Sequence, residues 1–116
     1  MSQTPVTSEE NYSAIVEVLL RSHGVSHAQG MFRSAGQLRV HNRIFAMLVN
    51  GNLVVKLPRE RVDALVSAGD GLRFDPGHGR IMKEWVSVGP DSKADWMSLS
   101  HEALNFIDAK YEPILK

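Results

Sequence analysis

The sequence predicts a two-layer α+β sandwich, in which helices cover one face of an antiparallel sheet. Three observations carry this prediction: apolar residues with helical spacing near both ends of the chain, strand-like alternation in the middle, and an Asn50-Gly51 dipeptide between two apolar runs. The predicted order is helix, three strands, helix, two strands, helix. A chain of 116 residues with 43% hydrophobic residues fits one compact domain, and residues 1–7 are expected to be disordered.

Residues 8–23 are predicted to form the first helix. Thr7 or Ser8 can accept hydrogen bonds from the first free amides, and two glutamates follow in the first turn, where the helix dipole favours negative charge. Gly24 comes after the last turn, where left-handed backbone is common. The apolar residues repeat with the i, i+3, i+4, i+7, i+8 spacing of one helix face: Tyr12, Ile15, Val16, Leu19 and Leu20.

The next part of the chain is predicted to form three consecutive antiparallel strands, at 31–40, 43–50 and 52–57. Asn50-Gly51 lies between IFAMLV and LVVKL, and a two-residue type I′ turn needs positive φ at both central positions, which Asn-Gly tolerates best. His41-Asn42, between QLRV and RIFAMLV, predicts a second tight turn. Together the two turns predict a meander.

The second half of the chain is predicted to contain two helices and two strands. Pro58 suits the first turn of a short helix, because proline fixes φ and lacks an N–H group. Residues 72–74 and 81–88 are predicted strands joined by DPGHGR. The last helix is predicted to open at residues 90–92, with Ser92-x-x-Asp95 as a capping box. Its predicted buried face carries Trp96, Leu99, Ala103, Phe106, Ile107 and Tyr111.

The strand at 43–50 is apolar on both faces. Simple alternation divides its side chains into two sets, which are Ile44, Ala46 and Leu48 on one side, and Phe45, Met47 and Val49 on the other. One interpretation is that helices and loops cover both faces. The other is that the face left open binds a partner, with a second copy of this chain as the first candidate.

The charges are divided unevenly along the chain. The net charge is zero, but residues 33–83 hold nine Lys and Arg against four Asp and Glu, a net charge of +5, which the remaining residues balance. The basic middle could form a surface for an anionic partner, or the acidic ends could pack against it and neutralise it. The second interpretation is favoured, since a zero total weakens long-range attraction to nucleic acid.

Several classes of protein are excluded by composition. The chain has no cysteine and therefore no disulfide, thiolate nucleophile or cysteine-based zinc site. No stretch approaches the roughly 20 apolar residues of a membrane-spanning helix, and no basic segment followed by an apolar run opens the sequence. We expect a cytoplasmic protein that does not contact a membrane.

No catalytic or metal-binding constellation stands out. His23 and His27 have the spacing of a helical metal-binding pair, but Gly24 interrupts the helix between them and no third ligand follows. No serine lies in a GxSxG motif, and the glycines of residues 69–79 match neither phosphate-loop pattern. We expect no catalytic residue, no metal and no cofactor.

The segment FDPGHGRIMKEWV, residues 74–86, is the best candidate for a ligand site. Its first half consists of turn residues, and alternation in its second half places Lys83 and Trp85 on one face, with Glu84 and Val86 on the other. A lysine beside a tryptophan can bind an anion or stack on a ring, although the same pair is common at sheet edges. The candidate ligand- or partner-binding residues are His78, Arg80, Lys83, Trp85, Phe45 and Met47.

Three segments resemble the TfoX N-terminal domain family, which is related to YjbR/MmcQ-like proteins: the IFAMLV-turn-LVVKLP hairpin, GHGRIMKEWV and the W..L..EAL.F helix. The similarity spans residues 31–107. It implies a small α/β sandwich with the element order given above, and a binding or regulatory module, not an enzyme. TfoX-type regulators of DNA-uptake competence carry a further C-terminal domain, for which a chain ending at Lys116 has no room, so no competence role is expected.

These observations support three functional hypotheses, in decreasing order. The first is a non-enzymatic binding domain of the TfoX N-terminal type, whose partner is another protein, a second copy in a homodimer or a small ligand. The second is weak nucleic-acid binding, with phosphate contacts from Arg33, Arg39, Arg43, Arg80 and Lys83. The third is an enzyme with His78, Arg80 and Glu84 around an anionic substrate.

Overall fold

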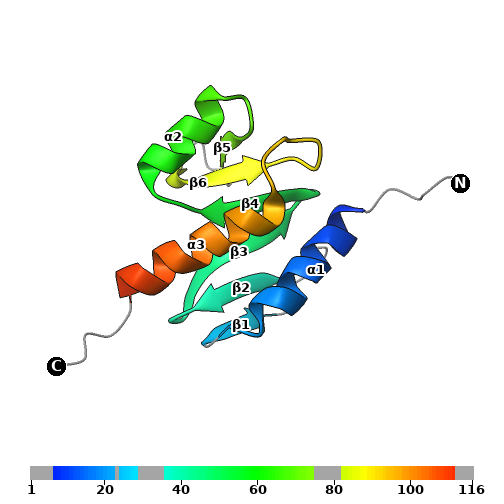
Figure 1. Ribbon diagram of the computed structural model, residues 1–116, viewed down its shortest axis with the longest axis vertical. Coiled ribbons are helices and arrows are strands. Elements are labelled where there is room, and N and C mark those ends of the chain that lie inside the picture. Colours follow the sequence, from blue (N-terminus) through cyan, green and yellow to red (C-terminus); the bar gives the residue numbers. More distant parts are fainter. Residues whose placement is uncertain (1–6, 23, 29–35, 75–81, 112–116) are drawn as a thin grey trace, which may run out of the picture.

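The computed structural model describes residues 7–22, 24–28, 36–74 and 82–111. In chain order the elements are α1 (Ser8–Leu19), β1 (Val25–Ala28), β2 (Gln37–Val40), β3 (Arg43–Val49), β4 (Asn52–Lys56), α2 (Arg59–Ser67), β5 (Leu72–Phe74), β6 (Met82–Val88) and α3 (Trp96–Tyr111). Figure 1 shows α1 and α3 crossing the same face of the sheet, with α2 beside β5 and β6. The predicted α+β class and element order are confirmed.

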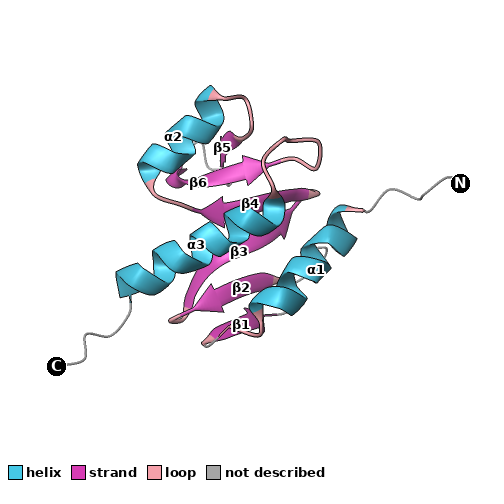
Figure 2. Cartoon of the chain, in the orientation of Figure 1, coloured by secondary structure: helices cyan, strands magenta, loops and turns pink. Residues whose placement is uncertain are grey.

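The strands of the described residues form one antiparallel sheet in the order β1-β2-β3-β4-β6-β5. The first four strands are the predicted meander extended by one strand. The chain then leaves β4 through α2, forms β5 at the far edge and returns through β6, which pairs with β4 (Figure 2). The crossover through α2 therefore brings the start of that helix close to the end of β4 and the beginning of β6.

Both predicted hairpin turns are present, with the backbone that type I′ turns require. His41 and Asn42 have φ values of 53° and 63°, and Asn50 and Gly51 have values of 51° and 80°. Positive φ at both central positions matches the twist of the flanking strands. These two turns fix the β2–β3 and β3–β4 connections.

Helix α1 begins at the predicted cap and ends earlier than predicted. Thr7 accepts a hydrogen bond from the Glu10 amide, and the Glu10 carboxylate accepts one from the Thr7 amide, so the two form a capping box. The helix buries Tyr12, Ile15 and Leu19 and ends at Leu19. The predicted limit of residue 23 is therefore too long.

Tyr12 joins α1 to the sheet through a buried phenol. Its hydroxyl lies 3.1 Å from the Gly36 carbonyl oxygen and 3.4 Å from that of Ala46, and can donate to either. Burial raises the pKa of the Tyr12 phenol, because the interior disfavours the charged phenolate. The neutral phenol is thus the form that the fold requires.

Strand β1 was not singled out by the sequence. Val25–Ala28 has no strong apolar alternation, and it forms a strand by pairing with β2, where Val25 faces Val40 and Ala28 faces Gln37. Four residues are too few for their own propensity to dominate over such pairing. The early end of α1 leaves room for this strand.

The ends of α2 and α3 differ in detail from the prediction. Helix α2 follows Pro58 as its N-cap and ends in a Schellman motif, where Gly69 has φ 79° and the Asp70 amide donates to the Leu65 carbonyl oxygen. Helix α3 begins at Trp96, capped by Asp95, whose carboxylate accepts from the Ser98 amide at 3.0 Å. The predicted capping box starting at Ser92 is therefore wrong.

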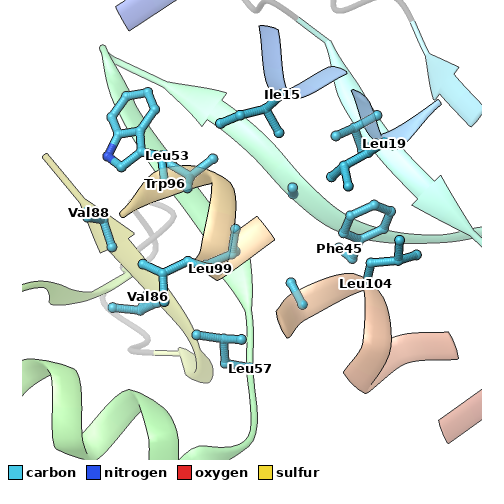
Figure 3. Packing of buried hydrophobic residues seen from close by; sticks show 14 of the residues in the cluster. Ile15, Leu19, Phe45, Leu53, Leu57, Val86, Val88, Trp96, Leu99 and Leu104 are labelled. Atoms are coloured by element: carbon cyan, nitrogen blue, oxygen red, sulfur yellow. The ribbon is translucent and has the colours of Figure 1, made fainter. Parts of the chain in front are cut away.

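The hydrophobic core fills the space between the sheet and the helices (Figure 3). Strands β4 and β6 supply it in register, since Leu53 pairs with Val88 and Val55 pairs with Val86, and all four side chains are fully buried. Helix α3 adds the predicted stripe, with Phe106 and Tyr111 partly buried and Leu104 in addition: Trp96, Leu99, Ala103, Leu104 and Ile107. The face of the sheet that carries Val86 is thus the face that the helices cover.

A bulge in β3 changes which face Phe45 occupies. Leu38 pairs with Ala46 and Arg39 pairs with Ile44, so Phe45 is an extra residue between two ladder pairs. Phe45 and Ala46 are both fully buried in the core, and Figure 3 shows Phe45 within the cluster that α1 and α3 complete. The alternation predicted for this strand is therefore wrong at this point.

No helix among the described residues is long and apolar enough to cross a membrane.

Candidate functional site

The face of the sheet opposite the helices is the first candidate site, and we call it the second face. Strand register assigns its members, because Met47 pairs with Val54, Val54 with Ser87, and Lys56 with Trp85. The helices α1, α2 and α3 all bury their apolar residues in the core on the other side. The second face comprises Gln37, Arg39, Ile44, Met47, Val49, Asn52, Val54, Lys56, Leu72, Trp85 and Ser87.

The centre of the second face is apolar. Val54 is fully buried there without belonging to the helix-side core, while Ile44, Met47, Val49 and Trp85 are half-buried. At the β5 edge Leu72 is 72% exposed. Half-buried methionine and tryptophan side chains are common where proteins bind one another.

The charges of the second face are all positive within the described strands. Arg39 and Lys56 lie on it, and Glu84, the one carboxylate of these strands, lies on the helix side, where Lys110 Nζ is 3.9 Å from its Oε1. Arg39 Nη2 donates to Gln37 Oε1 at 3.2 Å, and its Nε is buried with no hydrogen-bond partner among the described residues. The second face is thus apolar with a cationic rim.

The predicted contact between a lysine and Trp85 involves Lys56 instead of Lys83. The Lys56 ammonium lies 5.9 Å from the centre of the Trp85 ring, across the β4–β6 pair. Lys83 is exposed and lines a different site. The sequence suggested a lysine on the same strand as the tryptophan, whereas the contacting lysine comes from the neighbouring strand.

Met47 and Phe45, which the sequence grouped together, lie on opposite faces. Met47 is half-buried on the second face, but Phe45 is fully buried in the core. Phe45 therefore offers no surface to a partner. The bulge is the physical reason, and alternation alone could not reveal it.

A second candidate site is a cavity of about 290 Å³ between the start of α2 and strands β5 and β6. Of the described residues, Arg59, Asp63, Arg73 and Lys83 line it. Arg73 Nη2 donates to Asp63 Oδ1. Every one of these lining side chains is charged, and we call the site the cationic cavity.

A larger cavity of about 520 Å³ lies at the opposite end of α2. It is bordered by the turn around Gly69, Asp70 and Gly71, and by the loop that follows β6. In this region Ser92 Oγ donates to the Asp70 carbonyl oxygen at 2.7 Å, and Trp96 Nε1 donates to that of Gly89 at 3.1 Å. These bonds tie the loop to the core.

The basic residues proposed for nucleic-acid contact do not form one surface in the described part of the chain. Arg39 lies on the second face, whereas the Arg43 guanidinium stacks 4.4 Å from the centre of the Tyr111 ring of α3, on the helix side. Lys83 belongs to the cationic cavity. Arg33, like His78 and Arg80, lies outside the described residues.

The described histidines do not assemble a metal site. His41 Nε2 lies 2.8 Å from Asp108 Oδ1, which ties the β2–β3 turn to α3. Within the described ranges, no group of three or more His, Cys, Asp or Glu side chains could hold a metal ion. His23, one member of the pair that the sequence raised, lies outside those ranges.

Three residues of the candidate sites escaped the sequence reasoning: Lys56, Arg59 and Arg73. Arg59 and Arg73 are 14 positions apart in the chain and meet only because α2 and β5 follow one another at the sheet edge. The available signal was the basic character of the middle region, which identifies no particular residue. No family model, curated protein or solved structure matches this chain.

Proposed function

We propose that this chain is a non-enzymatic binding module of the TfoX N-terminal type, and that the second face is its binding surface. The observation that carries the proposal is that Ile44, Met47, Val49 and Trp85 gather, half-buried, on the side of the sheet away from all three helices. An apolar sheet face of this kind gains stability when a partner covers it. A cytoplasmic location is part of the proposal, since a chain without cysteine needs no oxidising compartment.

Charge favours a different protein over a second copy as the partner. In a two-fold symmetric dimer built on the second face, Arg39 and Lys56 would meet the same cations of the other copy or lie near them. A partner with acidic residues around an apolar patch would complement both features of the face. Self-association through this face stays the alternative.

Site-directed photo-crosslinking tests the surface. A photoreactive residue in place of Met47, on the second face, is expected to give discrete adducts in cells. The same residue in place of Asn105, exposed on α3, serves as the control. The Met47 adducts should disappear when Trp85→Ala is added. Equal labelling from both positions, or none from Met47, would contradict the proposal.

The mass of the adduct and the sedimentation of the pure protein separate the partner classes. An adduct of twice the chain mass, with a dimer in sedimentation velocity at about 100 µM, would identify a second copy. An adduct of another mass with a monomeric pure protein identifies a different protein. Turnover in a broad substrate screen would overturn the non-enzymatic part of the proposal.

Single-stranded nucleic acid is a second candidate ligand for the same face. The observation in its favour is that Trp85, a stacking side chain, lies beside the cation Lys56, an arrangement that suits base stacking and phosphate contact. Its affinity would fall steeply with salt, as counterions are released. A labelled oligonucleotide that shows no binding at about 50 mM salt eliminates this candidate.

A further inference from the structure

The cationic cavity carries an inference that goes beyond the proposed function and uses a different part of the molecule. It lies at the end of β6 where that strand runs past β4, beside the first turn of α2. Arg59 and Asp63 of α2, Arg73 of β5 and Lys83 of β6 converge on it. Three separate elements thus contribute charged side chains to one space.

The charges of the cavity do not cancel. Asp63 is engaged by Arg73, and these two charges balance. Arg59 and Lys83 have no carboxylate partner among the described residues, so the lining carries a net charge of +2. Glu60, the neighbour of Arg59, is exposed and does not line the cavity. Two like charges held near one space repel each other unless an anion lies between them.

The start of α2 adds to this positive potential. The N-cap is Pro58, whose side chain makes no capping hydrogen bond. The first amides of a helix carry partial positive charge, and Arg59, the first residue of α2, is itself a lining residue. The helix supports the cationic side chains here and does not by itself define the site.

We propose that the cationic cavity binds a phosphate group, as inorganic phosphate or as the phosphate of a small monoester. A phosphate monoester carries a charge of about −1.5 to −2 at neutral pH, which matches the +2 of the lining. A single carboxylate would leave one cation unbalanced. The volume of about 290 Å³ falls below the range of pockets for drug-sized ligands, so the ligand is small.

Titration of the ¹⁵N-labelled protein by NMR tests this site, with inorganic phosphate and glycerol 3-phosphate as probes and chloride adjusted to hold ionic strength constant. Saturable shifts are expected at the amides of Arg59, Arg73 and Lys83, with a Kd on the order of 1 mM. Saturation by both probes assigns a phosphate-group site, and tighter binding of glycerol 3-phosphate assigns a monoester site. Either result supports the proposal.

Three variants sharpen the test. Lys83→Gln should weaken phosphate binding by about tenfold, the effect of one charge-assisted contact, while the matched Lys93→Gln, on the loop after β6, should not change it. Asp63→Asn removes the carboxylate and frees Arg73, so it should tighten binding by about threefold or more. A general loss of folding cannot produce a tighter site.

Three outcomes would overturn the inference: no saturable shift up to about 20 mM phosphate, equal shifts with acetate at the same ionic strength, or equal effects of Lys83→Gln and Lys93→Gln. Crosslinking from Met47 is independent of all three, because Met47 lies on the second face and does not line the cavity. The failure of either idea therefore leaves the other testable.

Discussion

Lys56 and Trp85 face each other across the β4–β6 pair, with the lysine ammonium 5.9 Å from the centre of the indole ring. The pair lies on the second face, while the neighbouring residues Leu57 and Val86 are fully buried on the helix side. One residue step in β6 therefore separates the hydrophobic core from the proposed binding surface. This alternation gives the two tryptophans of the chain different structural roles.

Substitution of the two tryptophans should separate surface from core. Trp96 is 4% exposed and donates to the Gly89 carbonyl oxygen, so Trp96→Ala should lower the free energy of unfolding by about 3–5 kcal/mol. Trp85 is half-buried and should cost about 1–2 kcal/mol when changed to Ala. Urea denaturation of both variants measures the difference. Equal losses would place Trp85 in the core and remove the main anchor of the second face.

Gly71→Ala should destabilise the β5–β6 edge. A methyl group at position 71 would lie 2.7 Å from Val86 Cγ2 and 3.2 Å from the Ser87 carbonyl oxygen, so β6 would have to move. We expect a loss of about 1–3 kcal/mol in the free energy of unfolding. Gly89→Ala is the matched control, because its methyl group would meet only Asn52 Oδ1 at 3.6 Å. If the two variants unfold at the same urea concentration, the close approach at Gly71 is not limiting.

The alkaline stability of the protein should depend on Tyr12. The folded state raises the pKa of this phenol, so above about pH 10 the unfolded chain loses the proton while the folded chain keeps it. The unfolded state then binds fewer protons, and stability falls as pH rises, by at most about 1.4 kcal/mol per pH unit. Below pH 10 the contribution of the neutral phenol is complete.

Comparison with Tyr12→Phe isolates that effect. At pH 8 the wild type should be more stable by about 1–2 kcal/mol, because the variant leaves the Gly36 and Ala46 carbonyls without the phenol as donor. Between pH 8 and about pH 11 the difference should shrink, since only the wild type loses the Tyr12 contribution. Urea denaturation across this pH range measures it. A difference that stays constant would show that the phenol titrates alike in both states.

Much of the fold could be predicted because its signals are local. The Asn50-Gly51 turn and the α1 cap at Thr7 each depend on a few adjacent residues, and both are present. Strand β1 and the bulge at Phe45 depend on pairing with another strand, which no short stretch encodes. Sequence reasoning therefore recovered the element order and misplaced Phe45.

The candidate sites were harder to predict for the same reason. Trp85 and Met47 were identified, but the partner of Trp85 is Lys56, a residue 29 positions earlier that reaches it through the β4–β6 pair. The cationic cavity joins Arg59 to Lys83 across a helix and two strands. Spacing along the chain carries no sign of such contacts unless the sheet order is known.

Ser100 should tolerate loss of its hydroxyl. The residue is fully buried in α3, and its Oγ has no hydrogen-bond partner among the described residues. A buried unpaired hydroxyl costs free energy, and alanine has the higher helix propensity, so Ser100→Ala should leave stability unchanged or raise it by up to about 1 kcal/mol. The reciprocal change Ala103→Ser adds a hydroxyl to a fully buried position and should cost about 1–3 kcal/mol. Thermal and urea denaturation of the two variants check both directions. A clear loss of stability in Ser100→Ala would mean that the hydroxyl has a partner in solution, such as a buried water, and that α3 depends on it.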